Sequence, residues 1–259
     1  MITKKVNVDK ETPTEINEVP VTFGSGKIRL TGKILLPTTE HPVPGAILCH
    51  GLGSSYQAVE PSARIIASQG VATLIFDFHG HGHSGGVFDG NMVGDVIDAW
   101  HLLSEFPEID KKRIALAGHS MGAVAVILAS RQINPYTLIA LSCPPEPPAS
   151  WLAKPIAFAW HIWAYFASYQ LHADWQAFFR ALTKTKLSTS LRGVKSCSKL
   201  FVHCRGDHLT PYQLAMKLYE KASQPKDLLL AEGGFHSAPL LSRNLRSQWT
   251  QWAVATLMN

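Results

Sequence analysis

The stretch Ile114-Ala-Leu-Ala-Gly118-His-Ser120-Met-Gly122 is followed by an unbroken apolar run, residues 123–129. A short apolar segment, a turn with a serine between two glycines and a helix-forming run together predict a strand, a sharp turn and a helix. The glycines let the strand and the helix approach closely, so the Ser120 hydroxyl projects from the edge of a sheet. We interpret Ser120 as a candidate nucleophile; the alternative is a serine that only caps the helix.

A second match to the same pattern, Gly82-His-Ser84-Gly-Gly86, follows another strand-like segment, residues 73–77. Glycines continue to position 90, and a helix rarely starts through so much glycine. The next convincing helix begins only near Asn91. We therefore prefer Ser120 and expect Ser84 to be a loop serine whose hydroxyl bonds to the backbone.

Strand-like and helix-like segments alternate along most of the chain. Residues 19–23 and 28–36 predict an antiparallel hairpin. Short apolar strands are then predicted at residues 46–49, 73–76, 114–117, 138–141, 200–203 and 228–231, and helices at 56–68, 93–105, 123–131, 211–222 and 238–257. This order predicts an α/β fold with a mostly parallel central sheet, helices on both faces and ligand-binding loops at the carboxyl ends of the strands.

One region breaks the alternation and is rich in aromatic residues. Residues 151–179 hold ten of the 24 aromatic side chains of the chain. We expect an α/β core at residues 1–143 and 196–259, with a helical lid inserted at 144–195. Trp160, Trp163 and Phe166 are the tentative substrate-binding residues of this lid, although plain core helices or an oligomer contact would also fit. The apolar stretch 156–171 is shorter than the about 20 residues needed to span a bilayer.

Two later loops carry the partners that a serine nucleophile requires. Asp207 lies in the loop after the strand at 200–203, and His236 lies in the last loop before the final helix. A histidine accepts the serine proton while a carboxylate holds that histidine in the correct tautomer. The rival base is His208, the rival acid is Asp77, and Asp207 could instead be a turn residue.

Five segments in this order resemble the α/β-hydrolase family: 50–53 (His-Gly-Leu-Gly), 77–84 (Asp-Phe-His-Gly-His-Gly-His-Ser), the Ser120 turn, and the loops of Asp207 and His236. The resemblance implies the α/β-hydrolase fold, a Ser120-Asp207-His236 triad and an oxyanion hole made by the backbone N–H groups of Leu52 and Met121. The chain looks most similar to small bacterial carboxylesterases, including feruloyl or cinnamoyl esterases, and to monoacylglycerol-lipase-like members. It departs from many relatives at His79, where they have arginine, and at Ala123, where they have glycine.

Composition indicates the cellular compartment of the protein and the classes of partner that it could bind. The chain has 259 residues, four widely spaced cysteines and a polar start without a secretory signal, so we expect a cytoplasmic protein with buried thiols. Residues 175–206 are basic without an acidic residue; this is a solvated face or a site for an acidic substrate, a phosphate-bearing carrier or a membrane surface. We expect no nucleic-acid binding, no stable membrane insertion and no cofactor. The glycine-interleaved histidines at 79, 81 and 83 make a poor metal cage.

The sequence thus predicts a serine hydrolase that cleaves a small-molecule carboxylic ester through an acyl-enzyme, with an apolar or aromatic acyl group. An acyl thioesterase and a non-catalytic ligand-binding protein on the same fold are the alternatives. The sequence leaves the oligomeric state open, with a homodimer as one possibility. The side chain of His119 is expected to point away from the neighbouring nucleophile.

Overall fold

The protein is seen here in a computed structural model that describes residues 14–24, 27–39, 41–145 and 171–259. Its centre is an eight-stranded sheet of order β1-β2-β4-β3-β5-β6-β7-β8, in which β1 and β2 pair antiparallel, as do β2 and β4, and all other neighbours pair parallel. The strands are β1 Ile16–Phe23, β2 Leu30–Pro37, β3 Val43–Cys49, β4 Ala72–Phe76, β5 Ile109–His119, β6 Thr137–Leu141, β7 Ser198–Cys204 and β8 Lys226–Ala231.

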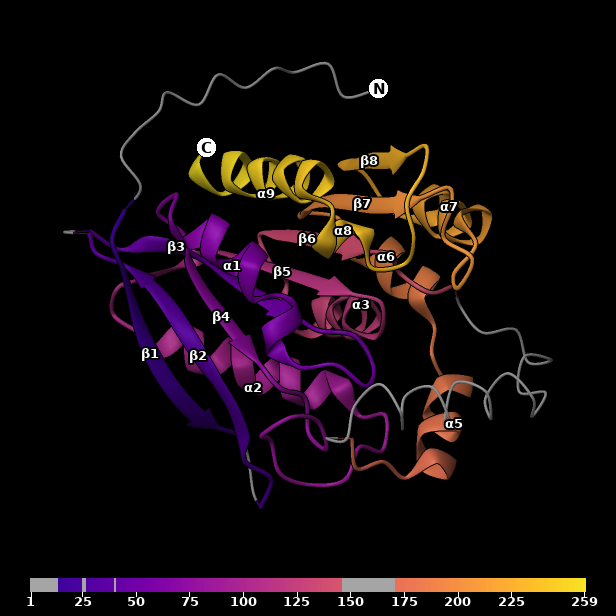
Figure 1. Cartoon of the computed structure of the whole chain (residues 1–259), viewed down its shortest axis with the longest axis horizontal. Coiled ribbons are helices and arrows are strands. Elements are labelled where there is room, and N and C mark those ends of the chain that lie inside the picture. Colours follow the sequence, from indigo (N-terminus) through magenta and orange to yellow (C-terminus); the bar gives the residue numbers. More distant parts are fainter. Residues whose placement is uncertain (1–13, 25–26, 40, 146–170) are drawn as a thin grey trace.

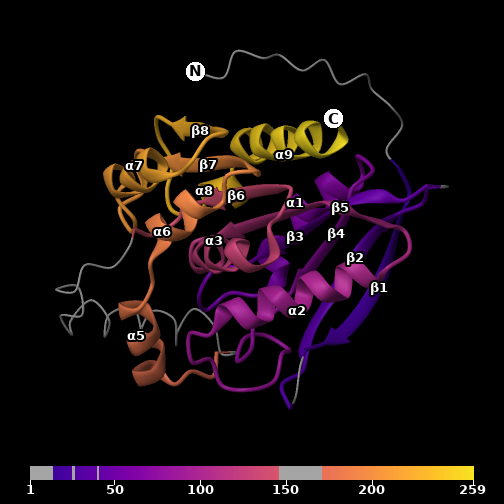
Figure 2. The same cartoon turned by 180° about the vertical axis from the view of Figure 1, so that it is seen from behind.

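Helices cover both faces of this sheet. They are η1 Tyr56–Ala58, α1 Glu60–Ala67, α2 Met92–Glu105, α3 Met121–Ile133, α5 Trp175–Thr183, α6 Leu187–Gly193, α7 Tyr212–Lys221, α8 Ala238–Leu241 and α9 Arg243–Met258. Helices α1 and α9 lie on one face, and α2 and α3 lie on the other (Figures 1 and 2). The alternating pattern is thus confirmed as an α/β fold with a mostly parallel sheet, and this architecture is the α/β-hydrolase fold that the resemblance implies.

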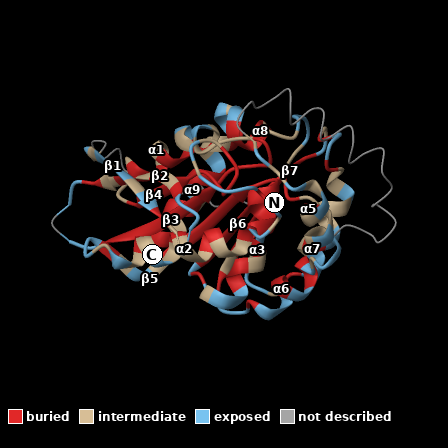
Figure 3. Ribbon diagram, turned by 90° about the horizontal axis from the view of Figure 1, so that it is seen from below, coloured by how far each residue is buried: buried red, intermediate tan, exposed pale blue. Residues whose placement is uncertain are grey.

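The core occupies two layers, one on each face of the sheet, because successive strand side chains point to opposite faces. Ile47 and Leu116 pack into the layer beneath α2 and α3, whereas Leu48 and Ala117 pack into the layer beneath α1 and α9. Strand β3 is buried along its whole length, and β5 is buried from Ile114 to His119 (Figure 3). Strands covered on both faces must be almost continuously apolar, which explains why they could be found in the sequence.

The predicted elements are present, but β5 begins at Ile109, five residues before the predicted start, and two of the predicted helices are each divided. Residues 56–68 form η1 and α1 rather than one helix, and residues 238–257 divide into α8 and α9. The second division falls at Ser242, whose hydroxyl accepts a hydrogen bond from the Leu245 amide. This bond caps the new helix and favours a fresh start over a continuous one.

Parallel pairing gathers the candidate site at one edge of the sheet. Cys49 of β3 lies opposite Gly118 of β5, His119 lies opposite Leu141 of β6, and Cys204 of β7 lies opposite Ala231 of β8. The loops that follow these strands therefore leave the sheet side by side.

The predicted lid is described only in part. Trp160, Trp163 and Phe166 lie outside the described residues. The described part contains α5 and α6, and α5 lies beside the loop between β4 and α2 (Figure 1). This loop and the segment before α5 are joined by isolated bridges from His81 to Leu171 and from Phe88 to Ala173.

All four cysteines are buried and unpaired, as predicted from their spacing. Burial raises the pKa of the Cys197 thiol to about 11, so this thiol is protonated near neutral pH. No helix among the described residues combines the length and the apolar character needed to cross a membrane.

Candidate active site

Ser120 occupies the tight turn between β5 and α3. Its backbone has φ 54° and ψ −116°, a region that residues with a side chain seldom adopt, and its amide donates to the carbonyl oxygen of Leu141 at 2.9 Å. A Cβ atom on Gly118 would overlap the carbonyl oxygen of Gly122, and one on Gly122 would lie 2.5 Å from the carbonyl oxygen of Cys49. Both glycines are therefore required by close backbone contacts, and Ser120 sits on a sharp, strained turn.

Asp207 and His236 meet across two loops. The Nδ1 atom of His236 lies 2.9 Å from Oδ2 of Asp207, and the carboxylate also accepts hydrogen bonds from the amides of Leu209 and Thr210 at 3.0 and 2.9 Å. Because a carboxylate only accepts, His236 carries its proton on Nδ1. His208, the rival base, is exposed. The loop thus directs the Asp207 carboxylate to His236.

Two neighbours of this pair were not found from the sequence. Thr210 donates its hydroxyl to Oδ2 of Asp207 at 2.7 Å, and His203 lies 3.4 Å from the same oxygen while it donates to the carbonyl oxygen of Thr210. Burial would raise the pKa of Asp207, but the hydrogen bonds from His236 and Thr210 lower it to about 2. The spacing of Thr210 three residues after Asp207 is a usable local signal, because Asp side chains often bond to nearby backbone in turns. His203 carries no such signal.

The other ring nitrogen of His236, Nε2, is buried and has no hydrogen-bond partner among the described residues. A buried polar atom without a partner is uncommon and asks for an explanation. The loop of His236 adjoins the Ser120 turn, since the rings of His119 and His236 have centroids 5.0 Å apart. With its proton on Nδ1, His236 presents the Nε2 lone pair as a proton acceptor beside this turn.

The loop after β3 approaches the Ser120 turn from the other side. A Cβ atom on Gly51 would lie 3.4 Å from Cβ of Ser120, so this loop runs directly past the serine. Among the described residues, neither the Leu52 amide nor the Met121 amide donates a hydrogen bond. Backbone donors that no protein group occupies are available to a ligand oxygen.

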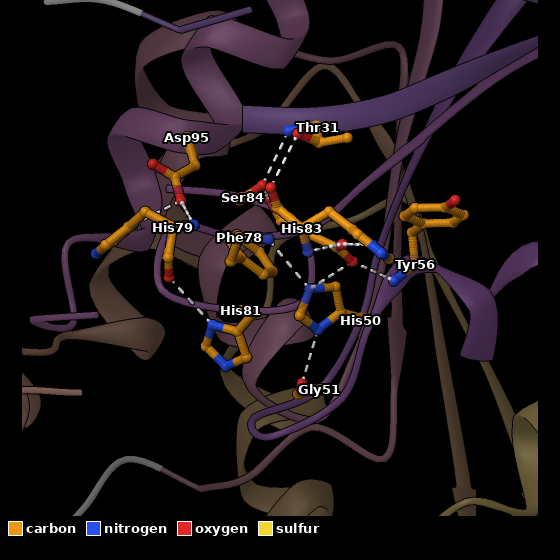
Figure 4. Close-up of polar contacts among 11 residues, drawn as sticks. Thr31, His50, Gly51, Tyr56, Phe78, His79, His81, His83, Ser84 and Asp95 are labelled. Atoms are coloured by element: carbon orange, nitrogen blue, oxygen red, sulfur yellow. Dashed lines mark hydrogen bonds and ion pairs between the residues drawn. The ribbon is translucent and has the colours of Figure 1, made fainter. Parts of the chain in front are cut away.

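His50 holds that loop in place. It is fully buried, its Nδ1 donates to the carbonyl oxygen of Gly51 at 2.8 Å, and its Nε2 accepts from the Phe78 amide at 3.1 Å (Figure 4). Burial lowers the pKa of His50, so the neutral ring can donate at one nitrogen and accept at the other. The two loops after β3 and β4 are thereby joined through one imidazole.

Ser84 has the structural role predicted for it. Its hydroxyl donates to the carbonyl oxygen of Asp77 at 2.6 Å and accepts from the Thr31 amide at 2.9 Å. The Asp77 carboxylate, the rival acid, accepts instead from the amides of Tyr56 and His83 at 2.7 and 2.9 Å (Figure 4). Both side chains order the loop after β4.

The histidines of this loop do not gather into a metal site. His79 Nδ1 lies 2.7 Å from Oδ2 of Asp95, and His79 Nε2 lies 3.2 Å from Oδ1 of Asp89. Within the part of the chain that the structure describes, no group of three His, Cys, Asp or Glu side chains could hold a metal ion. Their contacts are those of a packed, hydrogen-bonded loop.

The basic stretch 175–206 does not form a uniform surface. Lys199 is buried and donates to the carbonyl oxygen of Cys197 at 2.7 Å, and Arg205 pairs with Glu232 at 3.2 Å. The exposed cations of the stretch on or beside α5 and α6 are Arg180, Lys184, Lys186, Arg192 and Lys195. Apart from Arg205, the exposed positive charge of this stretch therefore lies on these two helices and their flanks.

The sheet order and the placement of these loops define an α/β hydrolase. The chain belongs to the family described as serine aminopeptidase, S33, whose sequence model matches residues 41–191, more than half of the chain.

The chain is similar to several known proteins. An uncharacterized protein of Mycobacterium tuberculosis (strain H37Rv) is 24% identical over 215 residues, which are 83% of this chain and 70% of the relative. An esterase of Pyrococcus furiosus superposes with a TM-score of 0.72 at 20% identity, covering 97% of this chain and 95% of its own. Est1E of Butyrivibrio proteoclasticus, solved with bound ferulic acid, has a TM-score of 0.71 at 17% identity, with 92% and 98% covered.

Proposed function

We propose that this protein is a serine hydrolase that cleaves carboxylic esters through an acyl-enzyme intermediate. The observation that carries the proposal is His236: Nδ1 is bonded to a buried carboxylate, while Nε2 is buried, unpartnered among the described residues and close to the Ser120 turn. An imidazole in this state is ready to accept a proton from a hydroxyl. Membership of a hydrolase family agrees with it.

In the proposed reaction, Ser120 Oγ attacks the ester carbonyl carbon as its proton passes to Nε2 of His236. The negative charge that develops on the carbonyl oxygen is stabilised by the amides of Leu52 and Met121. Collapse of the tetrahedral intermediate breaks the bond to the alcohol, which leaves with the proton from His236. Water, deprotonated by His236, then attacks the acyl-enzyme, and the acid and free Ser120 are released. Asp207 keeps the imidazole in one tautomer and stabilises its charged form.

An apolar or aromatic acyl group is part of the proposal. The aromatic rings of Trp175, Phe178 and Phe179 lie together on α5, with centroids of Phe178 and Phe179 5.4 Å apart. These rings belong to the aromatic-rich region that the sequence predicts as a lid, and a lid lined with such rings would favour an apolar acyl group. The buried, unpaired cysteines support the cytoplasmic location that we propose with this function.

A labelling experiment tests the proposal. A fluorophosphonate probe should label the wild type, and Ser120→Ala should remove the label, because the probe reacts only with an activated serine. Ser84→Ala is the matched control, since the same chemical change at the second motif should leave labelling intact. Folded wild type that takes no label would favour a non-catalytic binding protein, and label lost only in Ser84→Ala would place the nucleophile at Ser84.

A substrate panel separates ester hydrolysis from its alternatives. We expect higher kcat/KM for aryl and feruloyl esters than for aminoacyl arylamides or acyl-CoA thioesters. A preference for acyl-CoA would support the thioesterase alternative, which the exposed cations of α5 and α6 favour through attraction of phosphates. In that case Lys184→Glu and Lys186→Glu should raise KM for acyl-CoA alone. Turnover of arylamides but not of esters would contradict the ester proposal.

A further inference from the structure

The loop that carries His236 is exposed but held at a few points, because Glu232 pairs with Arg205 at 3.2 Å and Gly234 packs against Cys204. Residues 232–235 are exposed, and a Cβ atom on Gly233 would meet no other atom within 4 Å. Gly234 adopts a positive φ of 98°. Exposed, glycine-containing backbone opens at a lower free-energy cost than a packed strand or helix. Asp207 fixes the His236 ring through Nδ1, and a hydrogen bond to the main chain of His236 would fix the loop as well.

His119, at the end of β5, makes such a hydrogen bond to the main chain of His236. Its Nε2 lies 3.0 Å from the carbonyl oxygen of His236, 117 residues further along the chain, and the ring is 6% exposed. Because a carbonyl oxygen only accepts, His119 donates an N–H from Nε2. Among the described residues, no other group hydrogen-bonds to the main chain of His236.

The same ring also contacts the loop after β3. A Cβ atom on Gly51 would lie 3.2 Å from Nδ1 of His119, so the imidazole packs against the backbone that leads to the Leu52 amide. His119 directly precedes Ser120 and is the last residue of β5, a strand buried in the centre of the sheet. One rigid position therefore touches the serine turn, the loop of the Leu52 donor and the loop of His236.

The charge state of His119 suits this place. Burial and the neighbouring His236 ring lower the pKa of His119 to about 4, so His119 is neutral near pH 7. A neutral ring has a single N–H, which the His236 carbonyl oxygen assigns to Nε2. A cation here would oppose the imidazolium that forms on His236 during acyl transfer.

We propose that His119 is a positioning residue: its Nε2–H bond to the His236 carbonyl oxygen holds the proton acceptor over Ser120. The inference rests on the proposed hydrolase function, and it assigns a role to a side chain that is neither the nucleophile, the base nor the acid of the proposed triad. Misplacement of a catalytic group by about 1 Å can cost roughly 100-fold in rate.

Two substitutions of His119 separate the hydrogen bond from the packing of the ring. His119→Phe keeps a ring but removes the donor, and His119→Gln keeps an N–H donor of similar reach. We expect kcat for an aryl ester to fall roughly 10- to 100-fold in His119→Phe with KM nearly unchanged, and to return to within about threefold in His119→Gln. Exposed His101→Gln on α2 is the control and should match the wild type.

A second measurement is independent of turnover. With ¹⁵N-labelled histidine, the Nδ1–H proton of His236 should be visible by NMR in the wild type and in His119→Gln, and broadened in His119→Phe. Equal kcat and an unchanged His236 signal in His119→Phe would overturn the role, as would a His119→Gln enzyme no better than His119→Phe. If the wild type hydrolyses no ester, the proposed function fails, and the NMR comparison alone decides the role of His119.

Discussion

The Asp207 carboxylate is buried and is hydrogen-bonded at both oxygens. Its two oxygens accept from two backbone amides, the Thr210 hydroxyl and His236 Nδ1, and the side chain has no exposed surface. Its pKa of about 2 lies below the usual value for aspartate. The stabilisation that this shift reflects is present above about pH 4 and is lost as the pH falls through about 2. The pair with His236 therefore stays intact across the pH range of an ordinary assay.

We predict that Asp207→Asn lowers kcat by about 10³- to 10⁴-fold, because an amide no longer selects the tautomer with the proton on Nδ1. The rate of fluorophosphonate labelling measures this loss without a known substrate. Thr210→Val removes one hydrogen bond to the same carboxylate and should cost much less. If Asp207→Asn labels as fast as the wild type, Asp207 is not the acid of the triad and another carboxylate must fill that role.

At the scale of one element, the loop from β4 to α2 contains an ion pair that can titrate. His79 donates its backbone amide and its ring Nδ1–H to Oδ2 of Asp95, at 2.9 and 2.7 Å. Burial would lower the pKa of His79, but the carboxylates of Asp95 and Asp89 outweigh this effect and raise it.

We predict that this pair stabilises the fold more at pH 6 than at pH 9. The pKa of His79 is raised on folding, so the stabilisation is complete below its unfolded value, about 6.5, and is lost as the pH rises through the folded value. A double-mutant cycle of His79→Gln and Asp95→Asn, followed by urea unfolding, should give a coupling of about 1–3 kcal/mol at pH 6. A coupling that is equal at both pH values would contradict this reading.

At the scale of the whole molecule, Phe88 joins the described part of the inserted region to the core. Its amide donates to the carbonyl oxygen of His172 at 2.7 Å, and its carbonyl oxygen accepts from the Asp174 amide at 2.8 Å. The fully buried Phe88 ring lies 5.4 Å from the ring of Phe178 on α5. The loop between β4 and α2 thus holds α5 through two isolated bridges and the packing of Phe88 on Phe178.

We predict that Phe88→Ala lowers the free energy of unfolding by about 3–5 kcal/mol, because a buried ring is replaced by a cavity. Amide hydrogen exchange should accelerate over residues 175–183, while α3 remains protected. Val87→Ala is the matched control in the same loop; Val87 is 55% exposed, and its loss should change stability by about 0.5 kcal/mol or less. Uniformly faster exchange in Phe88→Ala would show a global effect rather than a local anchor.

Much of this architecture could be predicted from local pattern. The apolar runs, the glycines around Ser120 and the order of the Asp207 and His236 loops are each properties of a short segment. A strand buried on both faces requires apolar residues along a short segment, and a close backbone contact requires glycine at a single position. Both requirements can be recognised within a few residues of sequence. The parallel sheet and the order of the candidate residues followed from these constraints, whereas the division of the last helix at Ser242 did not.

The hydrogen-bond partners, the burial and the tautomers of the site residues were decided by tertiary packing. That Ser84 is tied to Thr31 and Asp77, that Lys199 is buried, and that His119 bonds to the main chain of His236 depend on residues distant in sequence. The proton on His236 Nδ1 is likewise assigned by a carboxylate 29 residues away. Burial, tautomer and hydrogen-bond partner are set by which loops the sheet brings together, so they emerge only when the chain is folded.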